Sequence, residues 1–243
     1  MSAVMDSRKA SARLIGALYL AGFVTYGVGS LLVTHVLHAP ALVSTISAHH
    51  TTLALGAFLI LLNSVTVVGL AVVFFPILQN HARRSALVYL AALISEAVLF
   101  AVGTLGVLMV IPLTRHGADA GVASVVGAKA LGSLATQWNN LAYQIAEISL
   151  GFGGMFLCAV LFRVRLVPRF LAGWGFIGYA ILLAGMIAEL FSIHIGTALS
   201  IPGGAFEVTL ACWLIVKGFR PEAYGRVSQS PVVRPAAELD AAA

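Results

Sequence analysis

Apolar residues dominate this chain in long runs that short polar segments separate. A stretch of about 20 apolar residues is long enough, as an α-helix, to cross the hydrocarbon core of a bilayer. The pattern therefore predicts an all-α, polytopic integral membrane protein, with a six-transmembrane-helix bundle formed by residues 1–220. The six runs cover about 14–36, 52–78, 87–113, 139–161, 170–191 and 197–216.

The segments between and after the runs are expected to lie outside the membrane. Residues 114–138 are rich in Gly, Ala, Ser and Val and predict an outer loop with a short amphipathic helix. Residues 221–243 contain Pro and Ala and predict a disordered cytoplasmic tail. The first run follows Arg8, Lys9 and Arg13, as in a signal peptide, but its roughly 23 apolar residues exceed the usual 7–15. We therefore expect it to remain as a membrane span.

The overall composition supports a membrane protein. The chain has 243 residues, of which 60% are hydrophobic and 9% are charged, and its mean hydropathy is +1.00. Soluble domains carry about 25% charged residues, which a surface facing water requires. The composition therefore excludes an ordinary soluble domain.

The basic residues predict the orientation in the membrane. All but two of the 14 lysines and arginines fall near the N-terminus, in 79–86, in 162–169 or after the last run, and the exceptions are Arg115 and Lys129. The positive-inside rule then places both termini in the cytoplasm, and we expect the inner membrane of a bacterium. Because topology explains the net charge of +5, no nucleic-acid partner is needed.

Four glutamates lie inside the last four apolar runs, namely Glu96, Glu147, Glu189 and Glu207. No Lys or Arg lies at a comparable depth to neutralise them. Ionisable residues within membrane spans are costly, and they commonly mark ion, proton or substrate sites. Each glutamate is therefore a candidate binding residue.

The fourth run has a polar and small face. Its members recur at spacings of three and four, which places them on one side of a helix. They are Asn140, Gln144, Glu147, Gly151, Gly154 and Cys158. We expect this face to look into the bundle, polar toward the outer end and glycine-rich toward the inner end.

Depth along the helices groups the polar candidates. Glu96 lies roughly 15 Å from the cytoplasmic start of its run, and Glu147, Glu207 and Asn63 lie at similar levels. We predict a mid-membrane cavity formed by these residues, with Gln144 and Asn140 toward the outside. Glu189 is near the outer end of its run and lines the outer mouth of the cavity or reaches only the interface.

Several kinds of chemistry are compatible with such a cavity. Desolvation and like charge disfavour ionised carboxylates, so we expect some of the glutamates to be protonated at neutral pH. Neutral glutamates could serve only as hydrogen bonds between helices. The functional alternatives are a proton or cation site, a pocket for a basic substrate, or a carboxylate-based catalyst.

Motifs for catalysis or cofactor binding are absent from the sequence. There is no HExxH, GxSxG, Walker loop or dinucleotide-binding GxGxxG. We therefore name no catalytic residue and no cofactor. The histidines have no recognisable ligand spacing, and no CxxC supports pairing of Cys158 with Cys212, so we predict no metal and no disulfide.

Three segments resemble a known family. They are RLIGALYL at 13–20, RLVPRFLAGWGFIGY at 165–179 and FEVTLACWLIVKGF at 206–219. These resemble the bacterial membrane-protein family called domain of unknown function 4386, over nearly all of 10–220. The resemblance implies a membrane fold without an established activity. It also implies that Glu96 and Glu207 occupy positions where glutamate is usual, whereas the Arg expected three residues before Glu96 is Leu93 here, which favours a protonated Glu96.

The sequence therefore supports three functional hypotheses. The first is binding or proton-linked transport of a small solute through the glutamate-lined cavity. The second is a non-catalytic scaffold or partner subunit, in which the glutamates act as packing contacts. The third is an intramembrane lipid-modifying hydrolase. The expected partners are the lipid bilayer, a small solute or proton, and a second copy or another membrane protein.

Overall fold

The computed structural model describes residues 2–39, 45–46, 48–117 and 122–220, and the tail predicted at 221–243 lies outside this part. The elements in the described part are all helices, as the all-α prediction requires. In chain order they are α1 (Ser2–Leu37), α3 (His50–Gly117), α4 (Val122–Val164), α5 (Arg169–Leu190), α6 (Gly196–Leu199) and α7 (Ile201–Val216).

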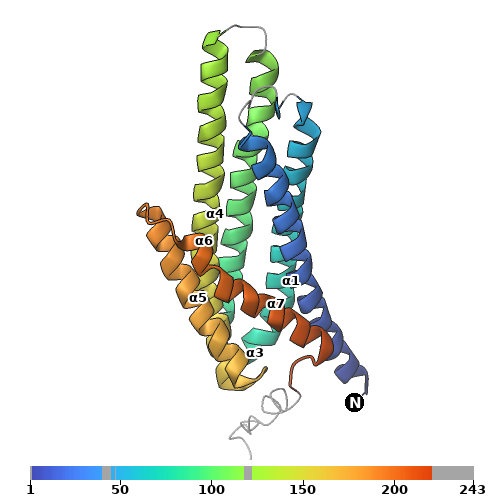
Figure 1. Ribbon diagram of the computed structural model, residues 1–243. Coiled ribbons are helices and arrows are strands. Elements are labelled where there is room, and N and C mark those ends of the chain that lie inside the picture. The colour runs from blue at the N-terminus through green and yellow to red at the C-terminus, as the bar shows by residue number, and fades with distance from the viewer. Residues whose placement is uncertain (1, 40–44, 47, 118–121, 221–243) are drawn as a thin grey trace, which may run out of the picture.

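Helix α3 is a hairpin and not one straight rod. A straight helix of its 68 residues would be about 100 Å long, three times the thickness of a hydrocarbon core. Ala82 interrupts it with non-helical backbone angles, φ −155° and ψ 81°. Beyond Ala82 the chain turns back, so the teal and green halves run antiparallel (Figure 1). Phe74 and Tyr89, on opposite sides of the break, pack edge to face with ring centroids 5.7 Å apart.

The helices form a closed ring. Going round it, α1 contacts α3, α3 contacts α4, α4 contacts α5, α5 contacts α7, and α7 returns to α1. Helix α7 runs obliquely across the lower part of the bundle, from the side of α5 to the lower end of α1 (Figure 1). This last contact closes an interior that all five helices share.

Glycines allow two of the crossings in this ring to be close. A Cβ placed on Gly29 of α1 would lie 2.8 Å from the carbonyl oxygen of Gly56 in α3. A Cβ on Gly178 of α5 would lie 3.1 Å from the backbone of Gly203 in α7. Small residues at helix contacts are typical of membrane proteins, since close backbone approach and packing drive helix association there.

The helices are apolar enough to cross a membrane. Four segments qualify by length and composition, namely 9–37, 50–112, 130–164 and 169–190, and 201–216 is a shorter apolar helix. Large apolar side chains also remain exposed on the outside of the bundle, among them Leu31, Val65 and Ile177. Apolar residues facing outward suit a protein whose solvent is lipid. The structure thus confirms a helical, membrane-embedded protein.

The segment 114–138, predicted as an outer loop with a short helix, is more helical than expected. The chain is helical up to Gly117 and again from Val122, so α4 has 43 residues and includes most of that segment. The reason is tertiary packing against the second half of α3. Trp138 donates a hydrogen bond from Nε1 to the carbonyl of Val102 at 2.9 Å, and Ala135 is buried.

Candidate functional site

A cavity of about 220 Å³ lies inside the ring, where two apolar clusters meet. The first cluster includes Phe74, Leu157 and Phe206. The second includes Val36, Leu53 and Val107. Side chains from α1, both halves of α3, α4, α5 and α7 line the cavity, so it depends on the closed ring.

Three glutamates line this cavity from three segments of the chain. Glu96 comes from the second half of α3, Glu147 from α4 and Glu207 from α7, and Asn63 joins them from the first half of α3. Glu147 and Glu207 are close enough to Glu96 for their charges to interact. The structure therefore brings together the four residues that depth along the helices had grouped.

Glu96 is the most buried of the three. As a residue, Glu96 is only 5% exposed. Its Oε2 atom has no hydrogen-bond partner among the residues that the structure describes. A buried polar atom without a partner costs about 1–3 kcal/mol, so this oxygen favours a bound proton, water or ligand.

Glu207 is held by a tyrosine. The hydroxyl of Tyr179 in α5 donates a hydrogen bond to Glu207 Oε1 at 2.6 Å. The Tyr179 ring packs edge to face on Phe206, with centroids 5.7 Å apart. Nearby, the hydroxyls of Tyr19 and Tyr89 lie 3.0 Å apart, and Tyr19 also lines the cavity. Tyrosine hydroxyls thus supply the polar contacts on this side of the cavity.

Three aromatic residues, Tyr26, Phe100 and Tyr143, form what we call the aromatic wall of the cavity. The Tyr26 ring lies 5.0 Å from the Phe100 ring and 5.6 Å from the Tyr143 ring, measured between centroids. The Phe100 and Tyr143 rings are 6.3 Å apart and nearly parallel. The wall therefore places three contacting aromatic rings in the lining of the same cavity as the carboxylates.

Three residues of the site, Phe100, Tyr143 and Tyr179, were not predicted from the sequence. Phe100 follows Glu96 by four residues, and Tyr143 precedes Glu147 by four. Residues at this spacing share a helix face, so the signal for these two was present. Tyr179 offers no such signal, because its contact with Glu207 joins two different helices.

The cavity is acidic, and besides the glutamates and tyrosines its described lining has the polar residues Asn63, Thr66 and Ser200. The described residues that line it include no Lys, Arg or His to neutralise the glutamates. The rest of the lining includes Leu70, Leu93 and Leu150. Within the part of the chain that the structure describes, no group of three or more His, Cys, Asp or Glu could hold a metal ion.

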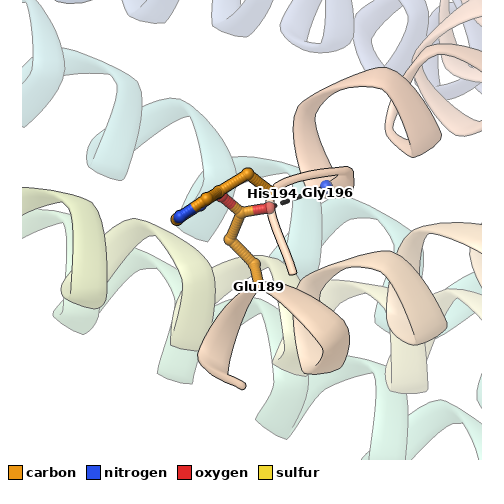
Figure 2. Close-up of polar contacts among 3 residues, drawn as sticks. All are labelled: Glu189, His194 and Gly196. Atoms are coloured by element: carbon orange, nitrogen blue, oxygen red, sulfur yellow. Dashed lines mark hydrogen bonds and ion pairs between the residues drawn. The ribbon is translucent and has the colours of Figure 1, made fainter. Parts of the chain in front are cut away.

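Glu189 does not line the cavity. Its carboxylate instead accepts a hydrogen bond from the backbone N–H of Gly196 at 2.8 Å and contacts His194 Nδ1 at 3.1 Å (Figure 2). Of the two alternatives expected for Glu189, the structure therefore does not support a place in the lining of the cavity, and a position at the outer end of its helix remains. The reason is that α5 ends at Leu190 and the chain then turns back, so that the backbone just after the helix supplies the contact to the Glu189 carboxylate.

Gln144 and Asn140 are also absent from the lining. Asn140 is exposed, and Gln144 is half-buried with an Oε1 atom that has no hydrogen-bond partner among the described residues. The predicted face of α4 is correct from Glu147 onward, where Gly151 meets Leu183 and Gly154 meets Tyr179 of α5. Toward the N-terminal end of α4 this face does not pack on α5, because α5 extends only part of the way along α4 (Figure 1).

Comparisons with known proteins identify a family but no characterised relative. A family described as "Domain of unknown function (DUF4386)" matches residues 14–218. No curated protein and no solved structure matches the chain.

Proposed function

Since the chain belongs to the family of domain of unknown function 4386, whose description names no activity, we propose a function from the cavity itself. The protein binds a small solute at the three glutamates and moves it across the membrane in a proton-linked way. The observation that carries this proposal is the unpartnered Oε2 of Glu96, which is buried and lines a cavity large enough for a solute. A bound proton or solute would give this oxygen the partner that helix packing does not supply.

We also propose six membrane spans. The two halves of α3 count as two because of the break at Ala82. Helix α7 has 16 residues, about 24 Å, but α6 precedes it directly and Ser200 between them has helical backbone angles. Together α6 and α7 approach the thickness of a hydrocarbon core, about 30 Å.

The orientation proposed is both termini in the cytoplasm of a bacterial cell. The start of α1, the Ala82 turn, the α4–α5 connection and the end of α7 lie at one end of the bundle (Figure 1). Basic residues gather in these segments, among them Arg84, Arg165 and Lys217. The positive-inside rule assigns such an end to the cytoplasm.

Thermal unfolding of the purified protein with a panel of small neutral, anionic and cationic solutes tests the binding role. We expect at least one solute to raise the melting temperature of the wild type and of Glu189→Gln, but not of Glu96→Gln. Glu189→Gln is the matched control, because this glutamate lies outside the cavity. Equal stabilisation of the wild type and of Gln variants at Glu96, Glu147 and Glu207 by every active solute would exclude the proposal.

Reconstitution into proteoliposomes tests transport. A solute found by thermal unfolding should cross the bilayer when a proton gradient is imposed and not in its absence, and Glu147→Gln should abolish that movement. Binding without any movement in the wild type would restrict the function to solute binding.

A further inference from the structure

We propose that the solute is a small organic ammonium ion with an apolar body. This rests on the proposed function, since it specifies the ligand of the same cavity.

The charge of the residues that line the cavity favours a cation over an anion or a neutral solute. Three carboxylates line the cavity, and its described lining has no basic side chain. An anion would be repelled by an ionised carboxylate, and a neutral solute would leave each carboxylate dependent on a bound proton for its neutrality. A cation can take the place of such a proton. Its positive charge pairs with the carboxylate, and an ammonium N–H can donate a hydrogen bond to the unpartnered Oε2 of Glu96.

The aromatic wall favours an organic ammonium over other cations. Faces of Tyr and Phe attract ammonium groups, and they suit alkylated ammonium ions in particular, because these ions are only weakly hydrated. Phe100 lies one turn from Glu96, and Tyr143 lies one turn from Glu147. Two carboxylates and the wall therefore meet in one region of the cavity, where the ammonium group would lie.

The remainder of the cavity suits the apolar body of such an ion. Leu70, Leu93 and Leu150 provide no oxygen ligands for an inorganic ion. The described acidic residues also do not form a group that could hold a metal. A cavity of 150 Å³ accommodates benzene, so 220 Å³ has room for roughly nine non-hydrogen atoms.

Binding would release a proton. In the empty cavity a proton compensates the buried carboxylate, and the arriving ammonium replaces it. The O–H bond of the carboxylic acid breaks, the proton leaves to bulk water, and the carboxylate pairs with the ammonium nitrogen. One cation thus enters for each proton released, which links solute and proton movement without any further reactant.

Matched probes test the charge requirement. Choline and 3,3-dimethylbutan-1-ol have the same shape and the same number of non-hydrogen atoms, but only choline is charged. Hexylammonium and hexan-1-ol form a second pair with a primary ammonium group. We expect one or both cations to bind the wild type in detergent at least about tenfold more tightly than their neutral partners, measured by calorimetry.

Variants locate the binding. Glu96→Gln should remove the preference for the cation, and Phe100→Leu should weaken choline several-fold. Phe152→Leu is the control, because Phe152 is exposed on the same bundle and does not line the cavity. Size-exclusion profiles and melting temperatures establish whether each variant is folded. If Glu96→Gln does not fold, Phe100→Leu still tests the proposal.

The pH dependence provides an independent readout. Protons compete with the cation for the carboxylate, so choline affinity should fall as the pH is lowered, while a neutral probe should be unaffected. Binding in weakly buffered solution should release protons that an indicator dye detects.

The outcomes separate this inference from the proposed function. If neutral probes bind as tightly as the cations and Glu96→Gln weakens both, the ammonium proposal is overturned while solute binding stands. If no ammonium ion binds but another solute of the panel binds in a Glu96-dependent way, the ammonium proposal is again overturned and solute binding again stands. If no solute of any charge depends on the glutamates, both proposals fail.

Discussion

The glutamates of this protein differ by what each carboxylate touches. Glu207 accepts a hydrogen bond from Tyr179, and Glu189 accepts one from the backbone of Gly196. Glu96 has an oxygen that receives neither kind of contact from the described residues. Similar residues in similar apolar runs therefore have different roles, because their neighbours in space differ.

The Tyr179–Glu207 contact should contribute to stability. Hydrogen bonds between membrane helices contribute about 0.6 kcal/mol on average and up to about 1.7 kcal/mol. We expect a double-mutant cycle of Tyr179→Phe and Glu207→Leu to give a coupling free energy of about 1 kcal/mol in unfolding experiments in detergent. Additive effects of the two substitutions would show that the bond contributes nothing.

Gly27 allows the cavity to be filled without disturbing the fold. It lines the cavity, and a Cβ added there would meet no atom within 4 Å. Gly27→Leu should reduce solute binding at least about tenfold, because each 1.4 kcal/mol of lost affinity is tenfold. Its melting temperature should stay equal or rise, since Leu favours helix more than Gly by nearly 1 kcal/mol.

The control for this substitution is Gly127→Leu. A Cβ at Gly127 also meets no atom within 4 Å, but this residue of α4 does not line the cavity. It should leave binding unchanged. Solute affinity that survives in Gly27→Leu would place the binding site elsewhere in the molecule.

At the scale of the elements, the crossing of α5 and α7 closes the ring. Gly178 of α5 faces the backbone of Gly203 in α7, which cannot move aside as a flexible side chain could. Tyr179 and Phe206, next to this crossing, hold one side of the cavity. The position of Glu207 therefore depends on how closely the two helices approach.

Gly178→Leu should force α5 and α7 apart. Overpacking of this kind costs about 1–3 kcal/mol, so we expect a lower melting temperature and weaker solute binding. Gly173→Leu is the control, because a Cβ there meets only the Phe162 ring, at 4.0 Å. If both variants unfold at the wild-type temperature, the crossing is not as close as described.

The sequence predicted helices far better than it predicted their ends. Hydropathy separated the two halves of α3, although only one residue, Ala82, breaks the helix between them. It did not predict that α4 begins at Val122, since helix there is stabilised by contacts such as that of Trp138 with Val102. These contacts join residues far apart in the chain, and periodicity carries no information about them.

For the whole molecule, the closed ring explains why the site could be predicted only in part. Depth along each helix correctly grouped Glu96, Glu147, Glu207 and Asn63, because polar residues at one level of a bundle tend to meet. The exclusion of Gln144 follows from the limited length of α5 alongside α4, which no local pattern specifies (Figure 1). The aromatic wall likewise needs three helices to be in place.

The proposed orientation predicts the behaviour of fusion proteins in bacteria. A fluorescent protein fused after the C-terminus should fluoresce, and alkaline phosphatase at the same point should be inactive, because this end is cytoplasmic. Alkaline phosphatase inserted after Gly117, at the opposite end of the bundle, should be active. Active alkaline phosphatase at the C-terminus would reverse the orientation.

The turn at Ala82 has a consequence for how the protein is made. Almost no chain separates the two halves of α3, so neither half can wait in water while the other enters the lipid. They must leave the ribosome and insert as a pair. Asn63 and Glu96, one on each half, then enter the bilayer together, ahead of Glu147 and Glu207, which lie later in the chain.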